Sequence, residues 1–489
     1  MLSRRIGLPL ALLLAAAFAL PPARVGATAP IDPRLQAALA SAPGAEQIQA
    51  VVNYDPRLTT GPTLAAAVQG LGAGTLTFGH LDSMGVLATA GQITSIATLP
   101  GVTGLYANAQ LQYFLHESVP AIGADRAWSD LGATGQGIGI AVIDSGIDGN
   151  NPDVAFGSKT VQNVKVVTDA SAVFSFQGEP PGRPLFLENV VNTDTTMGHG
   201  THVAGTAAGA GAASDGYYTG VAKDAHLVGV GAGDAIFILW ALAGFDYVLA
   251  HAGEYNIKVI SNSWGTSGGA AAYDPDDPIN RASKKAHDQG ITVVFAAGND
   301  GPAPDTMNPY AAAPWVIGVA AGCKPADTAH CPDGLLADFS SRGVPESAQF
   351  HPTLTAPGAH IVAPRALTGT LMTILDAPHD VQICSTAANP QFLPYYTCAS
   401  GTSMATPHVA GTVALMQAAA GGTMSPDQVK DTLAKTAAPM VKRDGTPYAL
   451  YEAGAGYLDA YAAVQVYRVT AAGATAPAAE RVTPQPAVE

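Results

Sequence analysis

The chain has 489 residues, of which 48% are hydrophobic and only 12% are charged. This is enough apolar material for one large core and a smaller domain, and the 54 glycines and 36 prolines are typical of a loop-rich globular protein rather than of a collagen or a disordered polymer. The formal net charge is -15 and no run of basic residues stands out, so no nucleic-acid partner is expected.

Residues 1–27 are predicted to be a signal peptide. Arg4 and Arg5 precede an apolar stretch from Ile6 to Leu20, and small residues near Ala27 supply a cleavage site. The apolar stretch is shorter than the roughly 20 residues that a membrane-spanning helix needs, which disfavours the alternative of a retained anchor. We therefore predict a secreted protein with no membrane contact after signal removal.

Residues 28–118 are predicted to form a small α/β domain. Extended runs rich in apolar or β-branched residues alternate with helix-compatible stretches, a pattern that indicates a small sheet covered by helices. The extended runs are residues 48–54, 84–90 and 102–114, and the helix-compatible stretches lie near residues 62–68 and 92–97.

Residues 119–468 show a different pattern, in which short apolar strands alternate with longer helical stretches. Such alternation predicts an α/β domain with a mostly parallel sheet and helices on both faces. The predicted strands are residues 138–143, 225–230, 259–263, 291–296 and 316–320, and the predicted helices are residues 201–208, 236–252, 279–289, 402–420 and 426–434. The Ala- and Pro-rich tail, residues 469–489, is predicted to be disordered.

The chain has four cysteines and no CxxC pair, which argues against a zinc or thioredoxin-type site. Four cysteines allow three pairings. We favour Cys323–Cys331 and Cys384–Cys398, because each pair closes a short loop and an exported protein is oxidised. Four reduced, buried thiols are the alternative.

Three motifs in the main domain carry residues suited to nucleophilic catalysis. Asp144 follows an apolar strand in AVIDSGID, and open parallel sheets build their sites at the carboxyl ends of strands. His199 opens a helix of small residues in GHGTHVAGT, and Ser403 lies at a helix N-terminus in SGTSMATPHVAG, where unpaired N–H groups favour negative charge. Taken singly, these residues could be a turn aspartate, a structural or metal-binding histidine and a helix cap.

Together and in this order, the three motifs resemble those of the subtilisin family of serine peptidases. The resemblance runs from about residue 128 to residue 464. It implies that Ser403 is the nucleophile, that His199 is the general base and then the acid, and that Asp144 orients the imidazole. It also implies a serine endopeptidase that hydrolyses peptide bonds in proteins through an acyl-enzyme.

The same resemblance extends the site beyond the triad. In VVFAAGND, Asn299 would donate its side-chain N–H to the oxyanion, with the backbone N–H of Ser403 as the second donor. The residues expected to form the two walls of the S1 substrate pocket are Ser263, Trp264 and Gly265 on one side, and Ala297 and Gly298 on the other. Core packing is the alternative for Trp264. An apolar or aromatic P1 residue is the default expectation.

Residues 28–118 resemble the inhibitory propeptide of the family. The likeness is carried by Leu99-Pro100-Gly101-Val102 and by the extended run that follows. It implies a zymogen whose own propeptide is an intramolecular inhibitor, with processing between Tyr113 and Ala121. A permanent accessory domain is the alternative.

The resemblance implies that the chemistry needs no cofactor, and it leaves a structural calcium ion open. Asp153, in Asn151-Pro152-Asp153, matches a segment whose acid can bind calcium in the family. A calcium ion needs several oxygen ligands, however, and residues 209–218 show no ligand-rich loop. No set of metal ligands is therefore assigned.

Three other functions compete with a peptidase. A catalytically inactive binding module is disfavoured because every triad position holds a competent residue. A metal-dependent hydrolase using His199 and His202 lacks the HExxH spacing and a third ligand, and we interpret His202 and His408 as structural. An esterase or acyltransferase could use the same triad, and only the family resemblance argues against it.

Overall fold

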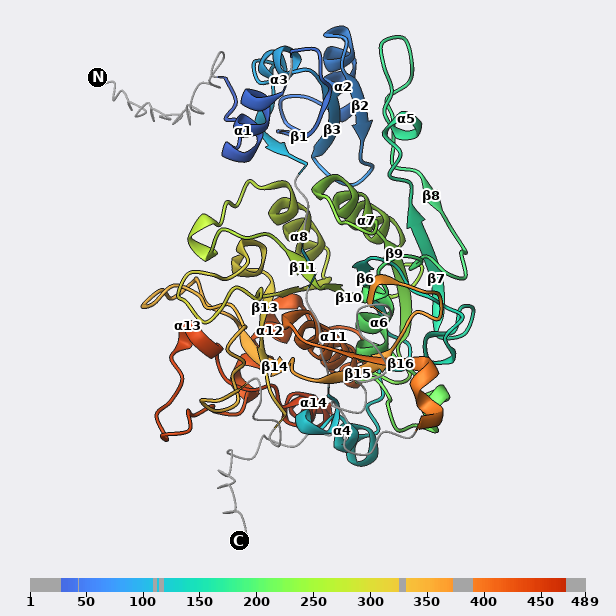
Figure 1. Ribbon diagram of the computed structural model, residues 1–489, viewed down its shortest axis with the longest axis vertical. Coiled ribbons are helices and arrows are strands. Elements are labelled where there is room, and N and C mark those ends of the chain that lie inside the picture. The colour runs from blue at the N-terminus through green and yellow to red at the C-terminus, as the bar shows by residue number, and fades with distance from the viewer. Residues whose placement is uncertain are drawn as a thin grey trace, which may run out of the picture.

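The computed structural model describes residues 28–42, 44–108, 112–113, 118–324, 331–372 and 390–471, which include a four-stranded and an eight-stranded sheet (Figure 1). The predicted signal peptide and most of the predicted disordered tail lie outside these residues. Within the described ranges, no helix is both long and apolar enough to cross a membrane.

The smaller sheet lies near the N-terminus, is antiparallel and has the order β2-β3-β1-β4. Its strands are β1 (Ile48–Tyr54), β2 (Gly74–Thr77), β3 (Ser83–Ala88) and β4 (Val102–Ala107), and its helices are α1 (Pro33–Ser41), α2 (Gly61–Gly70) and α3 (Ala90–Ile96). The side chains of Thr60 and Thr89 cap α2 and α3, which fixes where these helices begin. The predicted small α/β pattern is confirmed. The third predicted extended run, residues 102–114, differs in one respect: its strand in this sheet, β4, ends at Ala107.

Both faces of the smaller sheet are buried. On one face, Val52 packs in a core formed with α2 and α3. On the other face, Val51 and Leu76 belong to a core that includes helix α7 (Ile238–His251) of the larger unit. The N-terminal sheet therefore docks onto α7, as Figure 1 shows.

The larger sheet has the order β14-β13-β12-β10-β6-β9-β7-β8, and every neighbouring pair is parallel except β7 with β8. Its strands are β6 (Gly139–Asp144), β7 (Thr160–Val166), β8 (Phe186–Leu187), β9 (His226–Gly231), β10 (Ile257–Asn262), β12 (Thr292–Ala296), β13 (Ile317–Gly322) and β14 (Leu354–Pro357). The chain reverses its direction of strand addition at β6, and sites form at the carboxyl end of such a strand.

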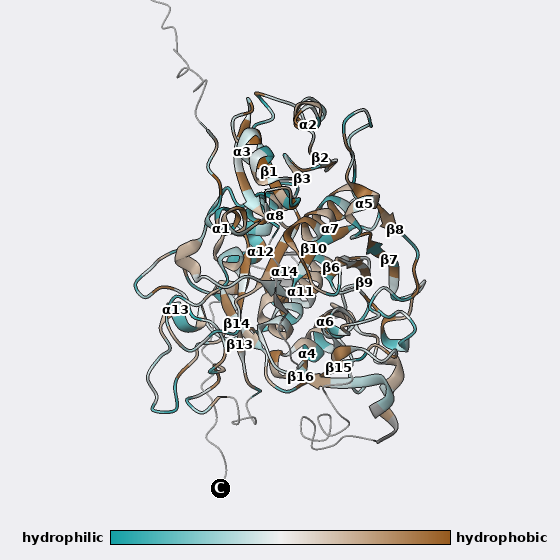
Figure 2. Ribbon diagram, turned by 45° about the horizontal axis from the view of Figure 1, so that its top comes forward, coloured by the Kyte–Doolittle hydropathy of each residue, from teal (hydrophilic) through white to brown (hydrophobic). Residues whose placement is uncertain are grey.

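Helices cover both faces of the larger sheet. In β6, Ile140 and Val142 pack into one core, whereas Ala141 and Ile143 pack into the other. The first core contains α4 (Ala124–Leu131), α6 (His199–Ala208), α11 (Thr402–Ala419), α12 (Pro426–Thr436) and α14 (Ala460–Ala471), and the second contains α7 and α8 (Pro278–Asp288). The hydrophobic colouring of α7 and the central strands reflects this burial (Figure 2). The predicted α/β fold is confirmed.

The remaining β-strands and α-helices of the described residues are short. They are the antiparallel pairs β5 (Gln112–Tyr113) with β11 (Trp264–Gly265) and β15 (Ile361–Pro364) with β16 (Tyr396–Ala399), and the helices α5 (Ala170–Val173) and α13 (Leu450–Ala453). The predicted disulfide Cys323–Cys331 is confirmed. Cys398 is also disulfide-bonded, and its predicted partner, Cys384, lies outside the described residues.

Candidate active site

The carboxylate of Asp144 and the imidazole of His199 are in direct contact. Asp144 ends β6 and His199 begins α6, and the distance from Oδ1 to Nδ1 is 2.6 Å. Both side chains are buried, and Oδ1 also accepts the backbone N–H of Ser145 at 2.8 Å. Because an ionised carboxylate only accepts hydrogen bonds, Nδ1 carries the proton in this contact, so Nε2 is the nitrogen that a base would use.

A glycine allows α6 to reach this position. A Cβ atom at Gly200 would lie 2.1 Å from the carbonyl oxygen of Gly146, in the loop that follows β6. No side chain fits there, so the glycine in the HGTH motif is needed for His199 to approach Asp144. Helix α11 packs directly against α6.

Ser403 lies in the first turn of α11 and is fully buried. Its hydroxyl donates to the carbonyl oxygen of Ser263 at 2.6 Å, and the hydroxyl of Ser263 donates to the carbonyl oxygen of Ser403 at 2.7 Å. A hydroxyl has one proton, so in this conformation the proton of Ser403 is used by Ser263. To be activated by His199, the hydroxyl must turn away from that carbonyl.

The side chain of Asn299 is held by the N-terminus of α11. Its Oδ1 accepts from the backbone N–H of Thr402 at 2.9 Å and from the Thr402 hydroxyl at 3.1 Å. The Thr402 hydroxyl also accepts the N–H of Gly298 at 3.0 Å. Because the oxygen is fixed on this side, the Nδ2 group is the end of the side chain that can donate to a substrate oxygen.

A residue that the sequence does not single out joins the two predicted pocket walls. Asn308 is buried, and its Nδ2 donates to the carbonyl oxygens of Ala296 at 2.9 Å and of Trp264 at 3.3 Å. Its Oδ1 accepts from the backbone N–H of Tyr310 at 3.1 Å. The side chain of Asn308 therefore ties the strand ends of β11 and β12 together, although nothing in its local sequence marks it.

Trp264 has separate roles for its side chain and its backbone. The side chain is fully buried, donates its Nε1–H to the carbonyl oxygen of Ile143 at 2.7 Å and packs edge-on against Phe295. This is the core packing that was the alternative for this residue. The backbone pairs antiparallel with β5, with Trp264 opposite Tyr113 and Gly265 opposite Gln112.

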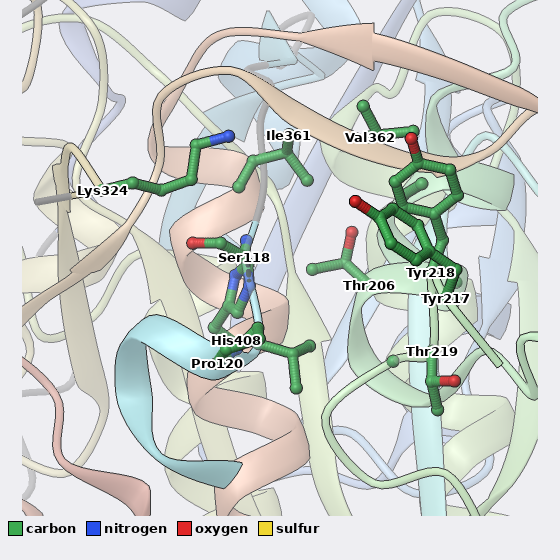
Figure 3. Close-up of a pocket in the computed structure, with 14 residues that line it drawn as sticks. Ser118, Pro120, Thr206, Tyr217, Tyr218, Thr219, Lys324, Ile361, Val362 and His408 are labelled. Carbon is green, nitrogen blue, oxygen red and sulfur yellow. Dashed lines mark hydrogen bonds between the residues drawn. The ribbon is translucent and has the colours of Figure 1, made fainter. Parts of the chain in front are cut away.

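His202 and His408 are both engaged with the backbone, as predicted for structural histidines. Nε2 of His202 lies 3.3 Å from two carbonyl oxygens. Nδ1 of His408 donates to the carbonyl oxygen of Met404 at 2.6 Å, and its Nε2 accepts the N–H of Ser118, beside a surface pocket that both residues line (Figure 3). Burial lowers the pKa of His202 to about 3 and that of His408 to about 4, so both rings are neutral at neutral pH.

The surroundings of Asp153 do not fit a calcium ion. Its Oδ1 accepts the backbone N–H of Ala213 at 2.8 Å, and its Oδ2 accepts the hydroxyl of Tyr396 at 2.6 Å. Calcium is bound by several oxygen acceptors, whereas these neighbours are donors. Burial raises the pKa of Asp153, which also disfavours a charged ligand. Among the described residues, no three His, Cys, Asp or Glu side chains form a group that could hold a metal ion.

Replacing Tyr396 with phenylalanine is expected to lower the free energy of unfolding by about 1–3 kcal/mol, because the buried Asp153 oxygen loses its donor. Urea unfolding of proteins carrying Ser403→Ala to prevent self-digestion would measure this, with Tyr395→Phe as the control. We expect the response of the protein to a chelator to be the same with and without Asp153→Asn. A chelator effect that Asp153→Asn abolishes would contradict this assignment.

Comparisons with known proteins support the fold and identify the family. The model of the Subtilase family matches residues 135–456. The chain is 33% identical over 319 residues to the serine protease AprX of Bacillus subtilis, with 61% of each protein covered. It is 31% identical over 310 residues to fervidolysin of Fervidobacterium pennivorans, with 60% of this chain and 36% of fervidolysin covered. The chain thus spans less than two thirds of the length of these relatives.

A solved structure supports the same architecture. The crystal structure of fervidolysin, described as a keratinolytic enzyme related to subtilisin, aligns with a TM-score of 0.61 over 90% of this chain and 63% of the other chain. The sequence identity in that alignment is 20%, so this likeness concerns the fold alone. Since the family model matches more than half of the sequence, the chain belongs to the subtilase family.

Proposed function

We propose that this chain is a secreted serine endopeptidase that cleaves peptide bonds in proteins through an acyl-enzyme and is made as a zymogen. The observation that carries the proposal is the buried contact of 2.6 Å between Asp144 and His199, beside helix α11, whose first turn holds Ser403. Its substrates are proteins and peptides, and export is proposed from the N-terminal signal sequence.

The residues divide the chemistry as follows. Ser403 Oγ attacks the carbonyl carbon of the scissile bond while Nε2 of His199 takes its proton, and His199 then gives that proton to the leaving amine. Asp144 stays ionised, keeps the proton of the resting imidazole on Nδ1 and stabilises the imidazolium. A water molecule, activated by His199 in the same way, hydrolyses the acyl-enzyme.

The tetrahedral intermediate carries a negative oxygen that needs donors. We assign Asn299 Nδ2 and the backbone N–H of Ser403 to this oxyanion, because Thr402 fixes the other end of the Asn299 side chain. The backbone of β11, on the Ser263 to Gly265 wall, is assigned to the substrate as an antiparallel partner. The pairing of β5 with β11 supports this assignment.

The zymogen proposal rests on two anchors on either side of the predicted processing point. Before it, Tyr113 in β5 pairs with Trp264. After it, the N–H of Ser118 binds His408, which lies farther along α11, the helix whose first turn holds Ser403. The two anchors favour cleavage of a peptide bond between Tyr113 and Ser118, within the range predicted from the sequence.

Labelling with a fluorophosphonate would test the whole proposal. We expect one adduct, on the peptide that contains Ser403, in a protein whose N-terminus lies between Phe114 and Ser118. An adduct on a protein that begins near Thr28 would overturn the zymogen part alone. If folded, processed protein gives no adduct, the proposal of a serine hydrolase is overturned, and an inactive binding module becomes the favoured function.

Replacing Asn299 with alanine is expected to lower kcat by about 10²–10³-fold with little change in KM, the size of loss seen when an oxyanion donor is removed from a subtilisin. Steady-state kinetics on a chromogenic peptide would measure it. Asp300→Ala, at the exposed neighbouring position, is the matched control and should keep full activity. An effect confined to KM would show that Asn299 binds substrate without stabilising the oxyanion.

A further inference from the structure

The chain between β7 and β8 forms an excursion, residues 167–185, which we call the arm. The arm leaves the edge of the larger sheet, where Val166 pairs with Phe186 and the N–H of Val167 donates to Leu185 at 2.9 Å. It contains α5 and extends alongside the N-terminal sheet, next to β2 (Figure 1). The arm belongs to the main domain in sequence but contacts the N-terminal domain in space.

The arm pairs with the edge strand of the N-terminal sheet. Thr75 of β2 and Ser175 of the arm exchange two backbone hydrogen bonds, of 2.8 Å and 3.0 Å. The N–H of Thr77 donates to the carbonyl oxygen of Gly182 at 2.6 Å, and the Thr77 hydroxyl donates to the same oxygen at 2.9 Å. An edge strand carries unpaired N–H and C=O groups that bind another extended segment. The arm supplies that segment.

The side chains of the arm fit β2 closely. Val173 and Phe174 are buried in the core that also contains Leu76 of β2. A Cβ atom at Gly74 would lie 3.1 Å from the ring of Phe176, so this ring packs over bare backbone. A Cβ atom at Gly182 would lie 2.1 Å from the carbonyl oxygen of Val173 and 2.4 Å from that of Thr75. Only glycine allows the three backbones to meet there.

These contacts do not depend on the covalent link between the domains. Cleavage between Tyr113 and Ser118 would break the covalent link between β5, at the end of the N-terminal segment, and the main domain, yet it would leave the pairing of the arm with β2 intact. Contacts from α7 also remain, since Asp246 accepts the N–H groups of Gly79 and His80 at 3.1 and 2.6 Å. The arm thus holds the N-terminal domain at a point remote in sequence from the processed bond.

We propose that the arm is a docking surface for β2 of the same chain, and that it retains the cleaved N-terminal domain and delays the appearance of activity. The inference rests on the zymogen proposed above, and it adds the surface that sets how long the cleaved domain stays bound. The occupant is the strand Gly74–Thr77. Its backbone groups form hydrogen bonds with the arm, and its Gly74 leaves room for the ring of Phe176.

The test follows the full-length chain while it processes itself. Intact-mass analysis would give the rate of cleavage, size-exclusion chromatography the rate at which the N-terminal fragment leaves, and a chromogenic peptide the rise of activity. We expect Phe176→Ala and Gly182→Ala to leave the cleavage rate and the final activity unchanged and to speed fragment release by about tenfold, the effect of losing about 1.4 kcal/mol of contact. Ser171→Ala, exposed on the arm, is the control and should release at the parent rate.

A substitution in β2, on the other side of the contact, distinguishes loss of the contact from misfolding of the arm. Thr77→Val removes one hydrogen bond to Gly182, leaves the arm sequence intact and should speed release by a smaller factor. If the fragment leaves all variants at the parent rate, the role of the arm is overturned while the zymogen stands. If the parent chain is never cleaved, the zymogen falls, and retention by the arm falls with it.

Discussion

Replacing Ser403 with alanine is expected to lower kcat for peptide hydrolysis by about 10⁶-fold and to leave the chain unprocessed. The loss is large because no other hydroxyl is assigned to attack the substrate, so His199 and Asp144 have no nucleophile to activate. The fold should survive, since the change removes one hydrogen bond, to the carbonyl oxygen of Ser263, worth about 1 kcal/mol. Steady-state kinetics and intact-mass analysis would measure both effects.

The matched control for Ser403→Ala is Ser425→Ala. Ser425 is the N-cap of α12, so its loss removes a serine hydroxyl at a helix N-terminus away from the proposed site. We expect that variant to be processed and fully active, with a free energy of unfolding lower by about 1 kcal/mol. Self-processing by the Ser403→Ala chain would identify a different nucleophile and remove the basis for the triad.

Replacing Asp144 with asparagine is expected to lower kcat by about 10⁴-fold with a nearly unchanged KM. If the amide keeps its oxygen on His199 Nδ1, the negative charge that stabilises the imidazolium is gone. If the amide turns its NH₂ group toward Nδ1, the ring must carry its proton on Nε2 and can no longer act as a base. Either orientation reduces the rate of proton transfer.

The same kinetics on Asp125→Asn control for the change of charge, because Asp125 is exposed on α4. Unfolding in urea would show whether the Asp144→Asn protein keeps its fold. A variant that is folded and retains more than about a tenth of the parent kcat would exclude Asp144 as the partner of the catalytic histidine, since the expected loss is about 10⁴-fold.

The sequence predicts those parts of the candidate site that are encoded in local motifs. Asp144, His199 and Ser403 each stand in a long motif, and the order of the motifs points to one chemistry. The contact between Asp144 and His199 joins a strand end to a helix start, which a strand–helix pattern places at one edge of the sheet. The roles of these residues stay predictions until the kinetic experiments are done.

Interactions between distant segments could not be predicted. Asn308 joins the two predicted pocket walls through the carbonyl oxygens of Trp264 and Ala296, and backbone acceptors leave no trace in a sequence. The side chain of Trp264 turned to the core because its indole N–H reaches the carbonyl oxygen of Ile143. A buried tryptophan and a pocket tryptophan look the same in the sequence.

Some strands of the structure were not predicted from the sequence, for similar physical reasons. β7 contains Gln162 and Asn163, two polar residues that are buried, which hides its strand pattern. The amide of Asn163 is satisfied by the carbonyl oxygen of Ile147 and the hydroxyl of Thr193, both in loops outside the strand. β2 and β14 have four residues each, too few to show a periodicity.

The core that α7 shares with the N-terminal sheet makes the stability of the main domain depend on whether the N-terminal domain is bound. While the two parts are together, Leu239 of α7 is fully buried in one cluster with Val51 and Leu76. If the N-terminal domain is released, as the zymogen proposal requires, this face of α7 becomes exposed to water, and each leucine-sized side chain that is exposed costs about 1.5–3 kcal/mol. Under the zymogen proposal, the mature protein would therefore have a lower free energy of unfolding than the intact chain, and its lifetime would depend more on the rate at which it unfolds.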